Sequence, residues 1–164
     1  FLLIFFIPSI PLILSFSYSF SSLYLFFFVN PVVLIVFMKH DKLTYNIISC
    51  AYTIYNTLGF GFLESVYKNA LILELQKNNF LVEQEKPLNV YYRNQIIGEF
   101  YVDLLVENKV VVELKSVQSL IKEHEVQLVN YLNGLWLDIG LLINFGPQGV
   151  EVKRKYRTFK AKES

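Results

Sequence analysis

Cysteine is nearly absent from this sequence of 164 residues, and the single one, Cys50, cannot form a disulfide within the chain. There are only two histidines, and no group of cysteine and histidine residues has the spacing of a zinc site. These absences exclude a disulfide-stabilised fold and a structural zinc domain. They fit a reducing compartment, so we expect a cytoplasmic location and a place in the core for Cys50.

A strong excess of charge of either sign is also absent, because 15 lysine and arginine residues balance 14 aspartate and glutamate residues. Composition alone therefore does not favour a nucleic-acid partner, and any such argument has to rest on local features. The C-terminal segment does carry a basic tail, which we interpret as a solvated edge strand. Its cations are Lys153, Arg154, Lys155, Arg157, Lys160 and Lys162.

Charge is missing altogether from residues 1–38. Residues 1–37 are apolar and numerous enough to cross a bilayer, but prolines and serines interrupt them, and they lack the basic start of a signal peptide. The only methionine, Met38, comes directly before the first charged residues. We therefore expect translation to start at Met38 and residues 1–37 to be a dispensable extension read through from upstream, with a membrane segment as the alternative. Residues 38–164 are then one domain, long enough to bury a core.

Apolar residues at the three-and-four spacing of amphipathic helices occur in three stretches after Met38. Short apolar runs between turn residues predict strands, and Pro87 is expected to divide the first of these into two. The predicted helices cover Leu43–Leu58, Leu63–Asn78 and Lys122–Leu135, and the predicted strands outside a central hairpin cover Phe80–Glu85, Leu88–Arg93, Ile139–Phe145 and Val150–Tyr156.

A β-hairpin carrying three charges is predicted between Phe100 and Lys115. Its arms alternate with period two, and in both arms the even-numbered residues are apolar. A three-residue turn at 107–109 keeps these apolar residues on one face, which we expect to face the core, whereas a two-residue turn would oppose apolar and charged faces. This register places Asp103 directly opposite Glu113.

Two carboxylates that face each other repel, so a cation is expected between Asp103 and Glu113. Mg²⁺ prefers oxygen ligands and commonly binds one or two carboxylates, with water and substrate phosphate completing its coordination. The carbonyl oxygen of Leu114 is a further candidate ligand. Lys115 lies on the same face as Glu113, where a lysine can orient or help deprotonate the attacking water and offset charge on a phosphate. The pattern favours hydrolysis of phosphodiester bonds, although charged strand faces commonly just face solvent.

The spacing of Asp103 and of Glu113-Leu114-Lys115 resembles the PD-(D/E)XK nuclease superfamily. Three further motifs are similar to motifs of that superfamily and follow one another in the order found there. With them, the resemblance covers about residues 42–157. They are Gly61-Phe-Leu-Glu64-Ser-Val-Tyr67, the signature of the prokaryotic GxxExxY protein family; Gln127-Leu-Val-Asn-Tyr131, the QxxxY element of the RecB-like branch; and Leu141-Leu-Ile-Asn-Phe145, a late strand of the GxxExxY family. Phe60 departs from the family, which commonly has proline there.

The resemblance implies a fold of the α/β (α+β) class, a restriction-endonuclease-like αβββαβ core with a mixed central sheet flanked by helices. The implied site combines metal ligands, a catalytic lysine and helix residues that position the substrate or the lysine. The implied metal ligands are Asp103 and Glu113, with Glu64 in the inner or outer shell of the metal, and they join the Leu114 carbonyl inferred above. The implied lysine is Lys115, and the positioning residues are Gln127 and Tyr131.

Some of these residues also have plainer explanations. Glu64 stands in the first turn of a helix, where the helix dipole favours a carboxylate. Gln127 and Tyr131 are one turn apart, as an ordinary surface pair would be. Tyr67 is expected to pack and not to react, and His124 is expected to be a surface histidine.

The function implied by the resemblance is metal-dependent hydrolysis of nucleic acid, with DNA as the expected substrate, Mg²⁺ or Mn²⁺ as the cofactor and no small-molecule cofactor. One alternative is a module that keeps the nuclease fold and binds nucleic acid or protein without turnover. A membrane-anchored protein would rest wholly on residues 1–37. The complete set of Asp103, Glu113 and Lys115 favours the nuclease.

Overall fold

The structure is a computed structural model that describes residues 6–7, 10–11 and 40–158. The chain divides into two units, residues 1–37 and residues 38–164. Among the described residues, no helix is both long enough and apolar enough to span a membrane.

A short hairpin is described in the first unit. Its strands β1 (Phe6–Ile7) and β2 (Ile10–Pro11) pair antiparallel. The prediction that residues 1–37 are read through from upstream lies outside the described residues.

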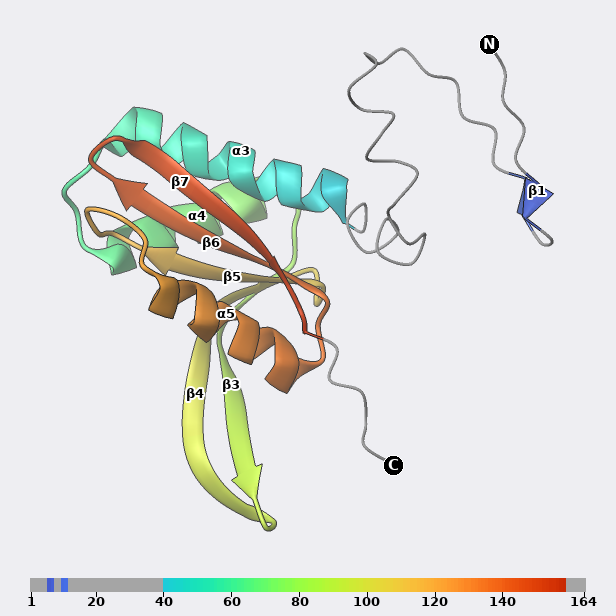
Figure 1. Ribbon diagram of the computed structural model, residues 1–164. Coiled ribbons are helices and arrows are strands. Elements are labelled where there is room, and N and C mark those ends of the chain that lie inside the picture. The colour runs from blue at the N-terminus through green and yellow to red at the C-terminus, as the bar shows by residue number, and fades with distance from the viewer. Residues whose placement is uncertain (1–5, 8–9, 12–39, 159–164) are drawn as a thin grey trace. The chain divides into compact units, whose positions relative to one another are not determined.

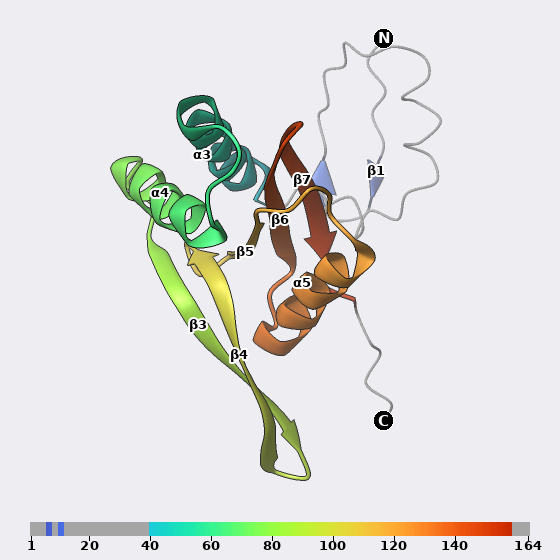
Figure 2. The same ribbon diagram turned by 90° about the vertical axis from the view of Figure 1, so that its left-hand side faces the viewer.

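The second unit is built around a mixed five-stranded sheet between two layers of helices. Its elements are α3 (Asp41–Leu58), α4 (Glu64–Lys77), β3 (Val82–Tyr92), β4 (Gln95–Val106), β5 (Val110–Lys115), α5 (Lys122–Leu135), β6 (Ile139–Gly146) and β7 (Gly149–Tyr156). The strand order is β3-β4-β5-β6-β7, in which β5 and β6 are parallel and the other neighbours antiparallel. Helices α3 and α4 lie on one face of the sheet and α5 on the other (Figures 1 and 2). This arrangement confirms the predicted α+β fold with a mixed central sheet.

The helices form where the apolar spacing predicts them. In α3, the side chains of Ile47, Ala51 and Ile54 recur every three or four residues and are buried. The helix ends at Gly59, which has a φ of +71°, a conformation that favours glycine over other residues. Helix α5 has the predicted bounds.

The sheet is buried on both faces by two separate core clusters. From Leu104 onward, the even-numbered residues of the central hairpin pack under α3 and α4, as predicted; they are Leu104, Val106, Val110, Val112 and Leu114. Phe100, which was also expected on this face, is 45% exposed. The odd-numbered Leu105 and Val111 are also buried, because they pack under α5. Val102 corrects the pattern, since it is even-numbered and yet packs with the cluster under α5. The alternation of β4 therefore reverses near Asp103. Before Asp103 an even-numbered residue packs under α5, and after it the even-numbered residues pack under α3 and α4.

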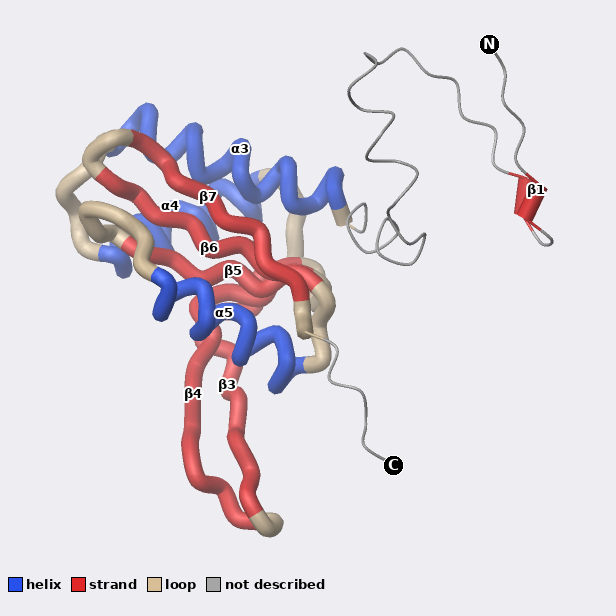
Figure 3. The backbone as a smooth tube through the Cα atoms, in the orientation of Figure 1, coloured by secondary structure: helices blue, strands red, loops and turns tan. Residues whose placement is uncertain are grey.

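Strand β3 runs through Pro87 without a break, so the prediction that Pro87 divides two strands is wrong. Because β3 is an edge strand, a residue that cannot donate a backbone hydrogen bond is tolerated there. The hairpin that β3 forms with β4 closes at Arg93 and Asn94, which both have positive φ, as a two-residue type I′ turn requires. Residues 88–100, here called the ribbon, extend the two strands beyond the rest of the sheet (Figure 3).

The described cations of the basic tail are paired with carboxylates. Lys153 lies 3.6 Å from Glu151, and Lys155 forms an ion pair with Glu125. Further pairs join Arg154 to Asp41 at 2.6 Å and Arg157 to Asp138 at 3.0 Å. These pairs neutralise much of the positive charge of β7, which agrees with its interpretation as an edge strand. Lys160 and Lys162 lie outside the described residues.

Candidate active site

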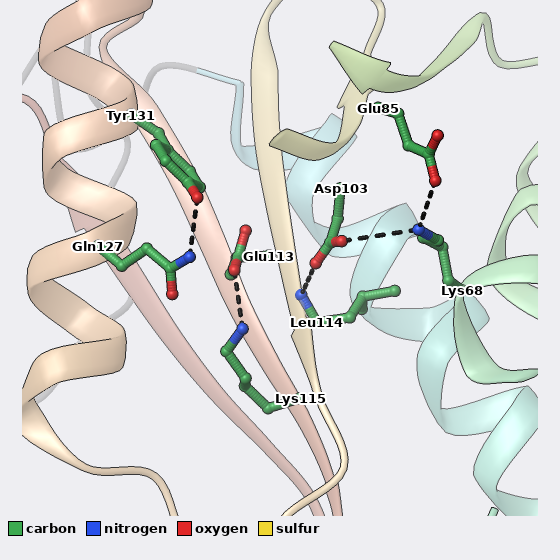
Figure 4. Close-up of polar contacts among 8 residues, drawn as sticks. All are labelled: Lys68, Glu85, Asp103, Glu113, Leu114, Lys115, Gln127 and Tyr131. Atoms are coloured by element: carbon green, nitrogen blue, oxygen red, sulfur yellow. Dashed lines mark hydrogen bonds and ion pairs between the residues drawn. The ribbon is translucent and has the colours of Figure 1, made fainter. Parts of the chain in front are cut away.

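The register of the central hairpin is the predicted one. Strands β4 and β5 pair as Leu104↔Val112, Leu105↔Val111 and Val106↔Val110. The ladder ends there, so the predicted direct pairing of Asp103 with Glu113 is not part of it. Instead, the backbone N–H of Leu114 donates a hydrogen bond to Oδ2 of Asp103 at 2.9 Å (Figure 4). The two strands separate at the point where the two carboxylates lie.

Asp103 uses its two carboxylate oxygens differently. Oδ2 accepts the hydrogen bond from Leu114, whereas Oδ1 lies 3.9 Å from Nζ of Lys68. The side chain is 16% exposed. Oδ1 is therefore the oxygen through which Asp103 can meet a cation.

Glu113 is a buried carboxylate, with 4% of its side chain exposed. Its Oε1 accepts a hydrogen bond from Nζ of Lys115 at 2.8 Å, and its Oε2 has no hydrogen-bond partner among the described residues. Burial, and then the charge of Asp103, raise the pKa of Glu113 from 4.5 to about 7, although Lys115 acts against this rise. An acidic group with a buried, unpaired oxygen is a group that a cation would stabilise.

Lys115 supplies positive charge next to this carboxylate. Burial by itself lowers the pKa of Lys115, but the hydrogen bond and charge of Glu113, with the charges of Glu64 and Asp103, raise it above its ordinary value. Lys115 is consequently an ammonium group at neutral pH. In this state it can stabilise negative charge, and it cannot accept a proton.

The motif that begins at Gly61 has a structural explanation. Gly61 has a φ of +121°, which favours glycine, in the loop between α3 and α4. The hydroxyl group of Tyr67 donates a hydrogen bond to the carbonyl oxygen of Gly59 at 2.7 Å and accepts one from the N–H of Phe62 at 3.3 Å. The ring of Tyr67 is fully buried and stacks on Phe145 at 4.3 Å. Tyr67 therefore packs, as expected, and holds the loop that leads into α4.

This loop sets the position of Glu64, the first residue of α4. Burial raises the pKa of Glu64, the charge of Lys115 lowers it, and the charge of Asp103 raises it further. Glu64 is thus close enough to the hairpin cluster to feel its charges. Ser116, next to Lys115, donates a hydrogen bond to the carbonyl oxygen of Phe62 at 2.8 Å and ties the same loop to the end of β5.

Tyr67→Phe should lower the free energy of unfolding by about 1 kcal/mol, because it removes the partner of two partly buried hydrogen bonds, those of the Gly59 carbonyl and the Phe62 N–H. Chemical denaturation of the purified protein measures the change. Tyr52→Phe is the control, since the Tyr52 hydroxyl makes one long, exposed hydrogen bond of 3.5 Å to Val150. Equal effects of the two substitutions would show that Tyr67 does not hold the loop.

Helix α5 brings Gln127 and Tyr131 to the other side of Glu113 (Figure 4). Nε2 of Gln127 donates a hydrogen bond to the hydroxyl group of Tyr131 at 2.8 Å. Burial raises the pKa of Tyr131, the Gln127 hydrogen bond lowers it, and the negative charge of Glu113 adds to the rise. The pair is therefore part of the surroundings of Glu113 and differs from an ordinary surface pair. His124, on the same helix, is half-buried, and its Nδ1 accepts a hydrogen bond from the N–H of Ile121 at 3.4 Å.

Lys68 and Glu85 also belong to the site, although they are not among its predicted residues. Nζ of Lys68 lies 3.2 Å from Oε1 of Glu85 and 3.9 Å from Oδ1 of Asp103. The helical spacing places Lys68 one turn after Glu64, and this spacing is the signal that could have found it. No such signal marks Glu85, because its position depends on how β3 pairs with β4.

The residues present fit a divalent cation that binds few protein ligands. Within residues 40–158, no three His, Cys, Asp or Glu side chains gather closely enough to hold a metal ion by themselves. Asp103 and Glu113 nevertheless offer carboxylate oxygens, one of them buried and unpaired, and Mg²⁺ commonly uses one or two carboxylates with water and phosphate. Glu64 interacts with this pair through the charge of Asp103, and its predicted part in the metal site stays a prediction.

The fold and the site together define the class of protein. It is an α+β protein with a mixed sheet, in which two carboxylates and a lysine lie where two central strands separate. The sequence model of the PD-(D/E)XK nuclease superfamily matches residues 41–155. The chain belongs to this superfamily, as its motifs predicted.

Comparisons with individual proteins add little to this assignment. One similar solved structure is described as "Crystal structure of SSO0001", with a TM-score of 0.49 and 18% sequence identity. The match covers 76% of this chain and 62% of that chain, which is less than two thirds of its length. No curated protein sequence matches.

Proposed function

We propose that this protein is a metal-dependent nuclease that hydrolyses phosphodiester bonds, with DNA as its substrate, and that it belongs to the GxxExxY branch of its superfamily. The observation that carries the proposal is the unpaired, buried Oε2 of Glu113 beside Asp103 and Lys115. Buried polar atoms that have only a structural role are nearly always hydrogen-bonded, so a buried carboxylate oxygen without a partner indicates a site for an ion. A cytoplasmic location is part of the proposal.

In this proposal Asp103 and Glu113 hold Mg²⁺ or Mn²⁺, with the carbonyl oxygen of Leu114 as a further ligand and Glu64 in support. The bound ion would supply positive charge to a phosphate and lower the pKa of a water molecule. The N–H of Leu114 fixes the carboxylate of Asp103 so that Oδ1 stays available.

The remaining residues act on the substrate. Lys115, an ammonium group held by Glu113 at 2.8 Å, stabilises the charge that develops on the phosphate. Gln127 and Tyr131, which are joined by their hydrogen bond, position the substrate or Lys115 from α5.

Cleavage of a panel of single- and double-stranded DNA and RNA, with Mg²⁺ or Mn²⁺ or with a chelator, tests the proposal. We expect metal-dependent cleavage of DNA by the wild-type protein and none by Asp103→Asn, which keeps the shape of the side chain and its hydrogen bond from Leu114. Glu99→Gln, which changes an exposed residue of the ribbon, should cleave as the wild-type protein does. If the protein binds nucleic acid without metal-dependent cleavage, the binding module is the correct interpretation.

A further inference from the structure

The pairing of β3 with β4 is interrupted next to the candidate site. The ladder leaves out Glu85 and Asp103, although the same register continues on both sides of them. Glu85 has a φ of +51°, which is uncommon for a residue other than glycine and costs about 1–3 kcal/mol. The flanking pairs are Gln84↔Leu104 and Lys86↔Val102. Glu85 therefore takes an unfavourable backbone conformation directly across from Asp103.

Lys68 lies between these two acidic residues (Figure 4). Its Nζ is 3.2 Å from Oε1 of Glu85 and 3.9 Å from Oδ1 of Asp103. The side chain of Lys68 is 19% exposed, whereas that of Glu85 is 65% exposed. The ammonium group thus approaches the one oxygen of Asp103 that Leu114 leaves available, and the more exposed Glu85 holds it at the shorter distance.

An ammonium group and a divalent cation are both attracted to Oδ1 of Asp103 and repel each other. Any tendency of Lys68 to move onto Asp103 therefore opposes metal binding, and the attraction of Glu85 for Lys68 favours it. We propose that the pair formed by Lys68 and Glu85 sets the affinity of the site for divalent cations. Lys68 competes for Asp103, and Glu85 acts only by drawing Lys68 away. The inference rests on the proposed function, since it assumes that Asp103 is a metal ligand.

The proposal predicts opposite effects of two substitutions. Lys68→Met removes the competing charge, so the affinity for Mn²⁺ should increase about fivefold or more. Glu85→Gln removes the group that draws Lys68 away, so the affinity should decrease by a similar factor of about five. When Lys68 is already methionine, the further substitution Glu85→Gln should not change the affinity, because there is no lysine for Glu85 to attract.

Isothermal titration calorimetry of the full chain with MnCl₂ at pH 7 tests these effects in the absence of substrate. The double-mutant cycle of Lys68→Met and Glu85→Gln decides between the proposal and a direct role of Glu85 as a metal ligand. The double variant should bind Mn²⁺ as tightly as Lys68→Met alone. The proposal would be overturned if the double variant bound Mn²⁺ more weakly than Lys68→Met does, by the full factor that Glu85→Gln causes in the wild-type protein.

Lys77→Met and Glu74→Gln form the matched control, because they remove an ion pair of 3.8 Å on the same helix. They should leave Mn²⁺ affinity unchanged. Lys68→Gln is a second replacement if Lys68→Met does not fold, which circular dichroism would reveal.

The outcomes also separate this inference from the proposed function. If the wild-type protein binds no Mn²⁺, the proposed function fails and this inference fails with it. If the wild-type protein binds Mn²⁺ and neither Lys68 substitution changes the affinity, only this inference fails, and the contact is an ordinary ion pair.

Discussion

Glu113→Gln is expected to make the metal-free protein more stable at pH 8 and inactive as a nuclease. The wild-type carboxyl group has a pKa of about 7 in the folded protein against 4.5 ordinarily, which corresponds to about 3 kcal/mol of lost folding free energy once it is ionised. Glutamine resembles the protonated carboxyl group and avoids this loss. The ligand that the proposed metal site needs is removed at the same time.

The pH dependence of this difference follows from the raised pKa. The folded state binds the Glu113 proton more tightly than the unfolded state does, so the contribution of Glu113 to stability is most favourable below pH 4.5 and decreases as the pH rises to about 7. Glu113→Gln and the wild-type protein should therefore have similar free energies of unfolding at pH 4, and the variant should gain its full advantage above pH 7. Urea denaturation from pH 4 to pH 8, with a chelator present, measures the difference.

Metal ions should reverse this order. Mg²⁺ or Mn²⁺ at about 1,000 times its dissociation constant would stabilise the wild-type protein by about 4.1 kcal/mol, which exceeds the advantage of the variant, and would stabilise the variant by much less. Glu99→Gln serves as the control, because it alters an exposed carboxylate and should follow the wild-type curve at every pH. If the difference in stability between Glu113→Gln and the wild-type protein did not change with pH, the ionised form of Glu113 would not be destabilised by burial.

Lys115→Met is expected to reduce the rate of cleavage by about 10²–10³-fold while metal binding is retained. The methionine side chain keeps much of the apolar length of lysine and removes the ammonium group that lies 2.8 Å from Glu113. Loss of this positive charge leaves the carboxylates free for a cation, so the affinity for Mn²⁺ should stay the same or increase. Single-turnover cleavage measures the rate, and calorimetry with MnCl₂ measures the affinity.

Lys109→Met is the matched control, since it removes an exposed ammonium group at the turn of the same hairpin. It should change neither the rate nor the affinity. If Lys115→Met loses cleavage and metal binding together, Lys115 serves to maintain the site and has no separate part in the reaction.

Much of the fold could be predicted because its patterns are local. The even-numbered apolar residues of the hairpin fixed its register, since a shift by one residue would expose them, and Leu104↔Val112 is the pairing they require. The helical spacing likewise placed α3, α4 and α5 within two residues of their bounds. Pro87 was misinterpreted because its effect depends on whether the strand is at an edge, which is a property of the whole sheet.

The candidate site was predictable only in part for a similar reason. Asp103, Glu113 and Lys115 follow from one hairpin and can be found by counting along it. The approach of Lys68 to Asp103 and Glu85 depends on how α4 packs against the sheet, and the positive φ of Glu85 depends on the pairing of β3 with β4. Burial of the odd-numbered face, which raises the pKa of Glu113, depends on the position of α5.

The ribbon has a consequence for local motion. Beyond the body of the sheet, each of its two strands has a single neighbour, and a two-stranded hairpin alone is only marginally stable in water. Its backbone amides should therefore exchange with solvent through local opening, while those of β5 and β6, buried at the centre, exchange only when the whole domain unfolds. This opening would stop before the interruption at Glu85 and Asp103, because Leu88 and Val102 pack under α5. The candidate site thus stands at the border between the part of the sheet that opens readily and the part that stays closed.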